Sequence, residues 1–141
     1  MTSNDSTHAA QAAELLVPVS AGELLDKIAI LRIKEARLSS EAKLVNVRRE
    51  LAALEREADR AIVRSSLGSL EADLRRVNEA LWDIEEEIRG HEARALFDSR
   101  FVQLARSVYV TNDERARIKR VINEAVSSLF VEEKSYDESS R

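Results

Sequence analysis

The chain has no cysteine, one proline, three glycines and two histidines in 141 residues. Without cysteine, disulfides and thiolate chemistry are excluded, and His8 and His91 are too few for a histidine-rich metal site. Proline and glycine are the strongest helix breakers, so their scarcity favours long helices. No apolar run approaches the ~20 residues of a membrane span, and residues 1–11 are polar. We therefore expect a cytoplasmic protein that does not span a membrane.

Charged residues are abundant, and acidic and basic residues are present in similar numbers. The formal net charge is -4, whereas domains that bind nucleic acids are normally basic, so we expect no nucleic-acid partner. Charged residues make up 34% and apolar residues 44% of the chain, a mixture typical of amphipathic helices in water. The sequence predicts an all-α fold with one domain at residues 17–136, between disordered ends at 1–16 and 137–141.

The clearest periodic stretch is residues 70–95, where apolar side chains recur in alternating steps of three and four residues. We expect this helix to organise the fold. A second stretch, about 41–64, has the same alternation, and the short connection at 65–69 predicts an antiparallel helical hairpin. The apolar seams of the two helices are Leu70, Leu74, Val77, Leu81, Ile84 and Ile88, and Leu44, Val47, Leu51, Leu54, Ala58 and Ala61.

Two further helical regions flank this predicted hairpin. An N-terminal helix at about 21–38 is predicted from the capping pair Ser20 and Glu23, and its wide apolar face indicates burial on two sides. At the other end, the polar residues 111–113 interrupt the pattern, and Thr111 with Glu114 repeats the capping signature. We expect a broken pair of helices at about 99–110 and 112–129, although one kinked rod would fit the same pattern.

Three stretches carry more polar side chains than packing requires. Beside the apolar seam of 70–95 lies a border of Asn78, Trp82, Glu85, Arg89 and Glu92, in which Glu85 and Arg89 have the spacing of a helix ion pair. On the predicted N-terminal helix, Lys27 and Lys34 share one face. The third is a run of hydrogen-bond donors around a predicted helix start, which suits a phosphate or carboxylate; it comprises Arg106, Tyr109, Asn112, Arg115 and Lys119.

Each stretch also has an ordinary interpretation as surface charge, a border salt bridge or cations around a kink. The functional interpretation requires the first, third and late helices to pack together. In that case their polar faces would line one cleft, with Glu85 and Glu92 orienting the arginines. We expect this convergence.

Most enzyme signatures are missing. The sequence has no glycine-rich phosphate loop, no nucleophile elbow and no His-Glu-x-x-His motif. One enzyme alternative remains, in which carboxylates hold Mg²⁺ as in all-α nucleotide pyrophosphatases. The acids that suggest it are Asp83, Glu86, Glu87, Asp113 and Glu114, which are equally typical of a solvated helix face.

Several motifs together resemble those of one protein family. They include Pro18-Val19-Ser20, Leu24-Leu25-Asp26-Lys27, Val77-Asn78, Leu81-Trp82-Asp83-Ile84-Glu85, Leu104-Ala105-Arg106-Ser107-Val108-Tyr109, Asn112-Asp113, Arg115-Ala116, Ile118-Lys119-Arg120 and Val131-Glu132-Glu133-Lys134-Ser135-Tyr136. By these motifs the chain is similar to a bacterial family of short all-helical proteins of unknown function. Some members of that family are encoded beside glycosyltransferases and other genes of surface polysaccharide assembly.

The resemblance extends over residues 18–136 and implies no known reaction, substrate or cofactor. It does imply that the polar residues above belong to motifs. It also implies that part of the segment 132–136 docks on the bundle, although its composition alone predicts a frayed end.

The leading functional hypothesis is a non-enzymatic binding or adaptor module for an anionic group, acting in surface polysaccharide synthesis. That group would be a sugar phosphate, a nucleotide sugar or an acidic segment of a partner enzyme. No cofactor, metal ligand or catalytic residue is predicted. A structural alternative is a coiled-coil-like homo-oligomer that pairs the helix at 41–64 with its copy. The expected ligand-binding residues are Lys27, Trp82, Glu85, Arg89, Arg106, Tyr109, Asn112, Arg115 and Lys119.

Overall fold

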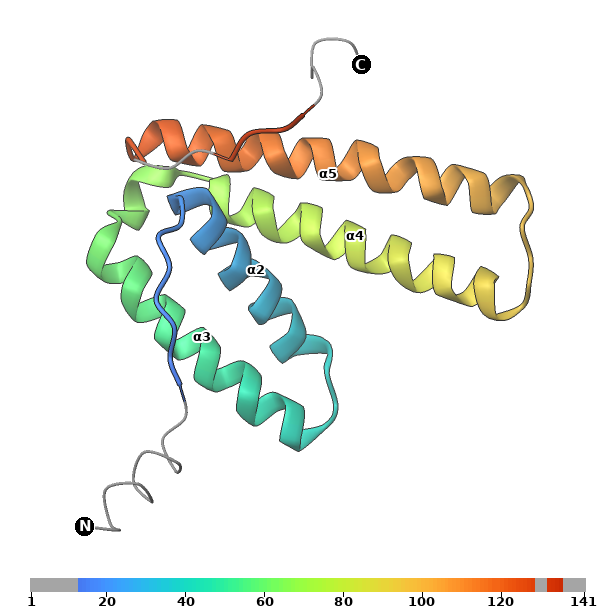
Figure 1. Ribbon diagram of the computed structural model, residues 1–141, viewed down its shortest axis with the longest axis horizontal. Helices are drawn as coiled ribbons and strands as arrows, with labels where there is room; N and C mark the ends of the chain where they lie inside the picture. Colours follow the sequence, from blue (N-terminus) through green and yellow to red (C-terminus); the bar gives the residue numbers. More distant parts are fainter. Residues whose placement is uncertain (1–12, 129–131, 136–141) are drawn as a thin grey trace.

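The computed structural model describes residues 13–128 and 132–135. In this part of the chain it contains helices and no strands, which confirms the all-α fold class (Figure 1). The predicted disordered ends lie largely outside the described residues; residues 13–16 are exposed and have no regular secondary structure. The elements are α2 (Ala21–Arg37), α3 (Glu41–Ala61), the short 3₁₀ helix η1 (Arg64–Leu67), α4 (Leu70–Ala93) and α5 (Ser99–Ala125).

The helices form two antiparallel pairs, α2 with α3 and α4 with α5, and the pairs cross at α2 (Figure 1). Helix α2 packs against α3, α4 and α5, so the expectation that it is buried on two sides is confirmed. The helix in contact with the other three α-helices is therefore α2, and the prediction that residues 70–95 organise the fold was wrong. A widened apolar face is the sequence signal for such a position.

The predicted hairpin of 41–64 with 70–95 was also wrong, because α3 and α4 diverge after η1 (Figure 1). The short connection between Arg37 and Glu41 makes α3 the antiparallel neighbour of α2 instead. The seam of α3 is used within the chain, since Leu44, Val47 and Ala58 are buried. Ala61, at the end of the same seam, is exposed, and pairing of α3 with its copy stays a prediction.

Helix α5 is continuous from Ser99 to Ala125, so the predicted break at residues 111–113 was wrong. The intrinsic preference of a threonine or asparagine against helix amounts to less than about 0.7 kcal/mol per residue. Leu104, Ile118 and Ile122, on either side of this stretch, are buried. Packing along both halves therefore outweighs the weak local preference. The predicted capping role of Glu114 is replaced by an ion pair with Arg117 at 2.7 Å.

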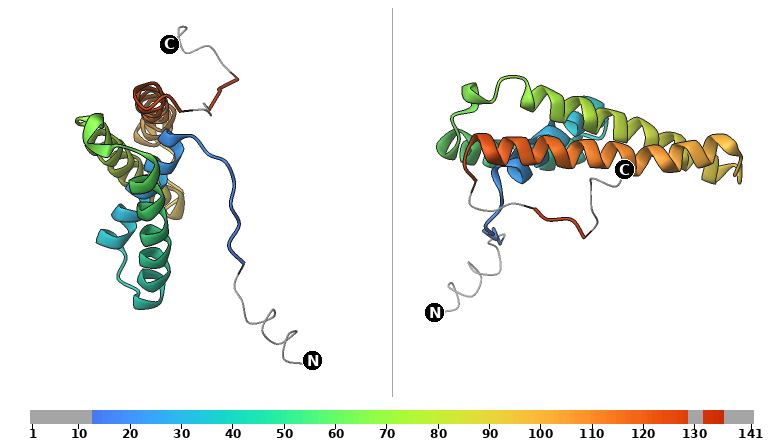
Figure 2. Two further views of the ribbon diagram at one scale, coloured as in Figure 1. Left: turned by 90° about the vertical axis from the view of Figure 1, so that its left-hand side faces the viewer. Right: turned by 90° about the horizontal axis from the view of Figure 1, so that it is seen from above.

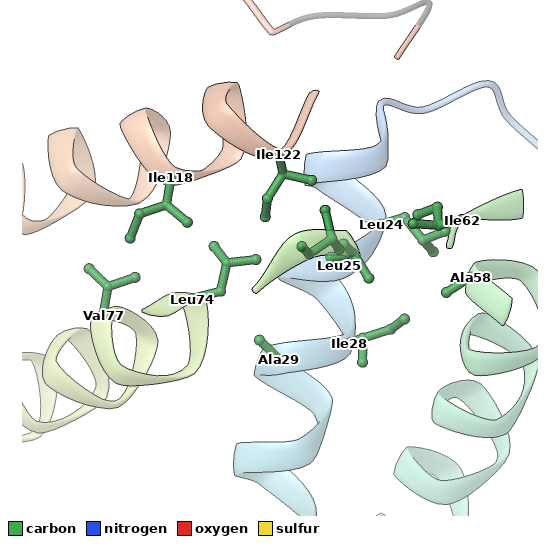
Figure 3. Packing of buried hydrophobic residues seen from close by; sticks show 11 residues of the cluster. Leu24, Leu25, Ile28, Ala29, Ala58, Ile62, Leu74, Val77, Ile118 and Ile122 are labelled. Carbon is green, nitrogen blue, oxygen red and sulfur yellow. The ribbon is translucent and has the colours of Figure 1, made fainter. Parts of the chain in front are cut away.

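The hydrophobic core lies where α2 crosses the α4–α5 pair (Figure 3). Leu25 and Ile28 of α2, Leu74 of α4, and Ile118 and Ile122 of α5 are each at most 1% exposed. Truncating one such side chain typically lowers the free energy of unfolding by about 2–5 kcal/mol. This core fixes the relative positions of the three helices that carry the polar groups described below.

Gly22 allows the first turn of α2 to lie directly against α5. A Cβ atom at this position would be 2.6 Å from the backbone oxygen of Lys119 and 3.0 Å from Oδ1 of Asn123. Any larger residue would separate the helices at this point. The glycine therefore sets the distance between the start of α2 and the C-terminal part of α5.

The α4–α5 pair extends beyond α2 and α3 as an arm (Figure 2). Its tip is closed by His91, whose Nδ1 lies 3.0 Å from the backbone oxygen of Leu96, and by the edge-on contact of Phe97 with Phe101 at 5.2 Å between ring centroids. In residues 13–128 and 132–135, no helix combines the length and the apolar character needed to cross a membrane.

Candidate anion-binding site

Buried polar side chains gather where α2, α4 and α5 meet. Asp26 of α2, Asn78 of α4, and Lys119 and Asn123 of α5 are all less than 9% exposed. Buried polar groups are tolerated when each has hydrogen-bond partners. The structure gives every one of these side chains such a partner.

A chain of hydrogen bonds runs from Asp26 through Asn78 to Arg115. Nδ2 of Asn78 donates to Oδ1 of Asp26 at 2.7 Å, and Nη1 of Arg115 donates to Oδ1 of Asn78 at 3.1 Å. An ionised carboxylate only accepts hydrogen bonds, so Asp26 determines which end of the amide faces it. The amide oxygen is thereby turned toward the guanidinium group of Arg115.

Lys119 is the second centre of the cluster. Its Nζ donates to Oε2 of Glu23 and to Oε2 of Glu132, each at 2.7 Å, and lies 3.9 Å from Oδ2 of Asp26. Burial of the ammonium group acts to lower its pKa, but the hydrogen bonds to Glu132 and Glu23 outweigh this effect, so the pKa of Lys119 is raised.

Glu132 bridges two ammonium groups. Besides its contact with Lys119, its Oε1 accepts from Nζ of Lys134 at 2.9 Å. The hydrogen bonds from Lys119 and Lys134 lower the pKa of Glu132 to about 2. The segment that carries Glu132 therefore docks on α5, as the family resemblance led us to expect. Tyr136, the last residue of the segment expected to dock, lies outside the described residues.

Backbone N–H groups in the first turn of α2 donate hydrogen bonds to side chains at and just after the end of α5. The hydroxyl of Ser20 caps the helix by accepting from the backbone N–H of Glu23 at 3.1 Å, as predicted. The N–H of Gly22 donates to Oδ1 of Asn123 at 2.7 Å, and that of Ala21 donates to the Ser128 hydroxyl at 3.1 Å. Backbone donors that a helix start leaves free are here used to join two helices.

Next to the polar cluster is a pocket of about 340 Å³ on the surface of α5. Its volume falls in the range of small-molecule sites, roughly 300–1,000 Å³. The docked C-terminal segment forms one wall. The lining residues are Val108, Tyr109, Asn112, Asp113, Arg115, Ala116, Lys119, Glu132 and Lys134.

Four of the residues predicted to bind a ligand line this pocket together: Tyr109, Asn112, Arg115 and Lys119. The other five lie elsewhere. Lys27 is exposed and its Nζ is 4.0 Å from Oε1 of Glu23. Glu85, Arg89 and Arg106 are exposed and do not line the pocket.

Trp82 also lies outside the pocket. Its Nε1 donates to Oε1 of Glu86 at 2.9 Å, and the guanidinium carbon of Arg37 lies 5.7 Å from its ring centroid. Arg37 donates in turn to Oδ1 of Asp83 at 2.6 Å. The border of α4 thus contacts α2 through Arg37. In the described part of the chain, Arg115 and Arg117 of α5 bond to Asn78 and Glu114, so the expectation that Glu85 and Glu92 orient the arginines of α5 was wrong. Acids of α2 and of the C-terminal segment lie beside Lys119 instead.

Asp26, Glu132 and Lys134 were not among the residues predicted to bind a ligand. Asp26 had a detectable signal, because it lies on the apolar face of α2 between Leu25 and Ile28. A charged residue in such a position is rarely buried without a partner. Glu132 and Lys134 lie outside any helical periodicity, so only the resemblance pointed to them.

The acids considered for a magnesium site are dispersed. Asp83 pairs with Arg37, Glu86 accepts from Trp82, and Glu87 pairs with Arg100 at 2.9 Å. Among residues 13–128 and 132–135, no group of three or more carboxylate or histidine side chains is arranged to hold a metal ion.

Comparison with known proteins identifies a family but no activity. The model of a family of unknown function, DUF6165, matches residues 15–140. Searches of curated proteins and of solved structures gave no match. The match includes every residue of the pocket.

Proposed function

Because the chain belongs to the DUF6165 family, whose description assigns no reaction, we propose from the geometry that it is a non-enzymatic binding module of the cytoplasm. Its ligand is a small molecule that carries a phosphate group. The phosphate binds in the pocket on α5, beside Arg115.

The state of Arg115 is the observation that carries this proposal. The side chain lines the pocket and is half-buried, yet its hydrogen bond goes to the neutral amide of Asn78. Among the described residues, no carboxylate forms an ion pair with it. A guanidinium group has five N–H donors in a planar fork that matches phosphate oxygens. Most of these donors remain for a ligand.

The other lining residues suit the rest of such a molecule. Asn112 adds an amide that can donate or accept, and the exposed ring of Tyr109 offers an apolar face with a hydroxyl. Asp113 adds a carboxylate to the lining, and carboxylates accept hydrogen bonds from hydroxyl groups. A polar pocket with donors and acceptors is complementary to a phosphorylated polyol.

Phosphorylated sugars and nucleotide sugars are therefore the class to test first. The proximity to glycosyltransferase genes that the family resemblance implies points the same way, toward a role in surface polysaccharide synthesis. The module would hold or present an activated sugar rather than transform it.

Amide chemical-shift mapping of the full chain tests the proposal. The probes are UDP-glucose, a glucose phosphate, inorganic phosphate and, as the uncharged control, glucose. We expect saturable shifts at Tyr109, Asn112 and Arg115 with the phosphorylated probes, and much smaller shifts with glucose. Residues 99–103, at the far end of the same helix, serve as the internal control. Absence of saturable shifts at the pocket with every phosphorylated probe would refute the proposal.

A further inference from the structure

We propose that Glu132 is a built-in competitor for the pocket, and that a ligand phosphate must displace it from the two lysines. This inference rests on the proposed function, because it concerns the regulation of the same site. It assigns the C-terminal segment 132–135 an autoinhibitory role.

The carboxylate of Glu132 already occupies the place of an anion. Its two oxygens accept hydrogen bonds from Lys119 at 2.7 Å and from Lys134 at 2.9 Å, and both lysines line the pocket. Carboxylate and phosphate oxygens compete for the same donors, since both form short charge-assisted hydrogen bonds with ammonium groups. While Glu132 is docked, Arg115 is therefore the one cationic side chain among the described lining residues that has no carboxylate partner.

The three acids around Lys119 differ in how they are held. Glu23 and Asp26 belong to α2, and Asp26 is fixed by Asn78 in the interior. Glu132 lies on a segment without regular secondary structure, and 41% of its side chain is exposed. It is therefore the acid that can leave without disturbing the packing of α2 on α5.

Release of Glu132 does not leave the buried ammonium group of Lys119 without a carboxylate partner. Lys119 keeps its hydrogen bond to Glu23 at 2.7 Å and its proximity to Asp26 at 3.9 Å. Leaving a buried charge unpaired is the main penalty when an ion pair is broken, and here it is avoided. An incoming phosphate would gain Lys119 and Lys134 in addition to Arg115.

The test compares Glu132→Gln with Glu133→Gln in the full chain. Glu133 is the adjacent acid and is exposed, so the control makes the same change in net charge without touching the lysines. The probe is UDP-glucose, titrated by calorimetry at fixed ionic strength. We expect Glu132→Gln to bind about fivefold more tightly than wild type, the upper end of the scale for a partly exposed ion pair. Glu133→Gln should bind within about twofold of wild type.

The outcomes separate this inference from the proposed function. If wild type binds and Glu132→Gln binds with equal or weaker affinity, the competitor role is overturned while the binding function stands. If neither protein binds, both fall. If Glu133→Gln tightens binding as much as Glu132→Gln, the effect is one of net charge, and the competitor role is again overturned.

A second measurement does not depend on a variant. Adding UDP-glucose to wild type should move the carboxyl carbon and amide resonances of Glu132 toward random-coil values, because its carboxylate is released from both lysines while Lys134 stays at the pocket. Saturation of the pocket with these resonances unchanged would show that ligand and Glu132 bind together, which contradicts displacement.

Discussion

Arg115 and Asn78 are hydrogen-bonded at 3.1 Å between Nη1 and Oδ1, and this contact joins the pocket to the interior of the bundle. The other end of the Asn78 amide donates to Asp26 at 2.7 Å. The guanidinium group is therefore held from the core side. Its orientation at the pocket depends on a buried carboxylate of another helix.

Asn78→Leu should lower the free energy of unfolding by about 2 kcal/mol, because it leaves the buried Asp26 oxygen without its amide donor. Chemical denaturation with urea measures this change. Asn46→Leu on α3 is the control, since Asn46 is exposed and its substitution should change stability by less than about 0.5 kcal/mol. Equal midpoints for the two variants would contradict the role given to Asn78.

Gly22→Ala should destabilise the protein by about 1–3 kcal/mol, because the new Cβ would lie 2.6 Å from the backbone oxygen of Lys119 and push α2 away from α5. Thermal unfolding by circular dichroism provides the measurement. Gly90→Ala is the matched control: the nearest atom to its Cβ would be Nη2 of Arg94, at 4.0 Å. In a helix interior this change should raise stability by up to about 1 kcal/mol. A harmless Gly22→Ala would show that the helices do not approach so closely.

The C-terminal segment should stay docked at a lower pH than it would if Glu132 had the pKa of a free glutamate. The pKa of Glu132 is lowered to about 2 by Lys119 and Lys134, below the value of about 4.3 for a free glutamate. Since the folded-state pKa is the lower one, this ion pair contributes stability in full above the free-glutamate pKa. That stability is lost as the pH falls through about 2. The carboxyl carbon resonance of Glu132, followed by NMR, should titrate near 2; a midpoint above 4 would contradict the bridged geometry.

Trp82 is the only tryptophan in the chain, and its emission should not respond to ligands of the pocket. Its ring contacts Arg37 and Glu86, and it does not line the pocket. Arg37→Met should change the emission, because it removes the cation from the ring face. Fluorescence titration with UDP-glucose checks the first statement. A saturable change of Trp82 emission, with Arg37→Met leaving that change intact, would place the ligand on α4 instead.

The helices could be predicted from periodicity, because burying one helix face requires apolar residues at regular spacing. Which helix packs against each face could not be predicted in this way. Leu44, Val47 and Ala58 predicted a seam, but a seam with the same spacing fits α2 or α4 equally well. Connection length decided the outcome, since three residues separate α2 from α3 and force them to be neighbours.

Polar residues at seam positions explain both the missed continuity of α5 and part of the site. Leu104, Val108, Thr111, Arg115, Ile118 and Ile122 follow one another in steps of four and three. Thr111 and Arg115 are polar members of that series. Their presence at positions otherwise apolar led to the incorrect prediction of a helix break. Arg115 instead meets Asn78, a polar member of the facing helix. The contact between Arg115 and Asn78 could not be predicted from the sequence. It depends on the register of the two helices, which is defined only once they pack together.

Calorimetric titration of UDP-glucose into wild type, Arg115→Gln and Arg117→Gln gives the sharpest test of anion binding at Arg115. Arg117 lies on the same helix, is exposed and pairs with Glu114, so it controls for loss of one positive charge. Arg115→Gln should weaken binding by at least about tenfold, the scale of a charge-assisted hydrogen bond to phosphate, whereas Arg117→Gln should leave it within about twofold. Equal affinities for the two variants, or no heat with any of the three proteins, would contradict anion binding at Arg115.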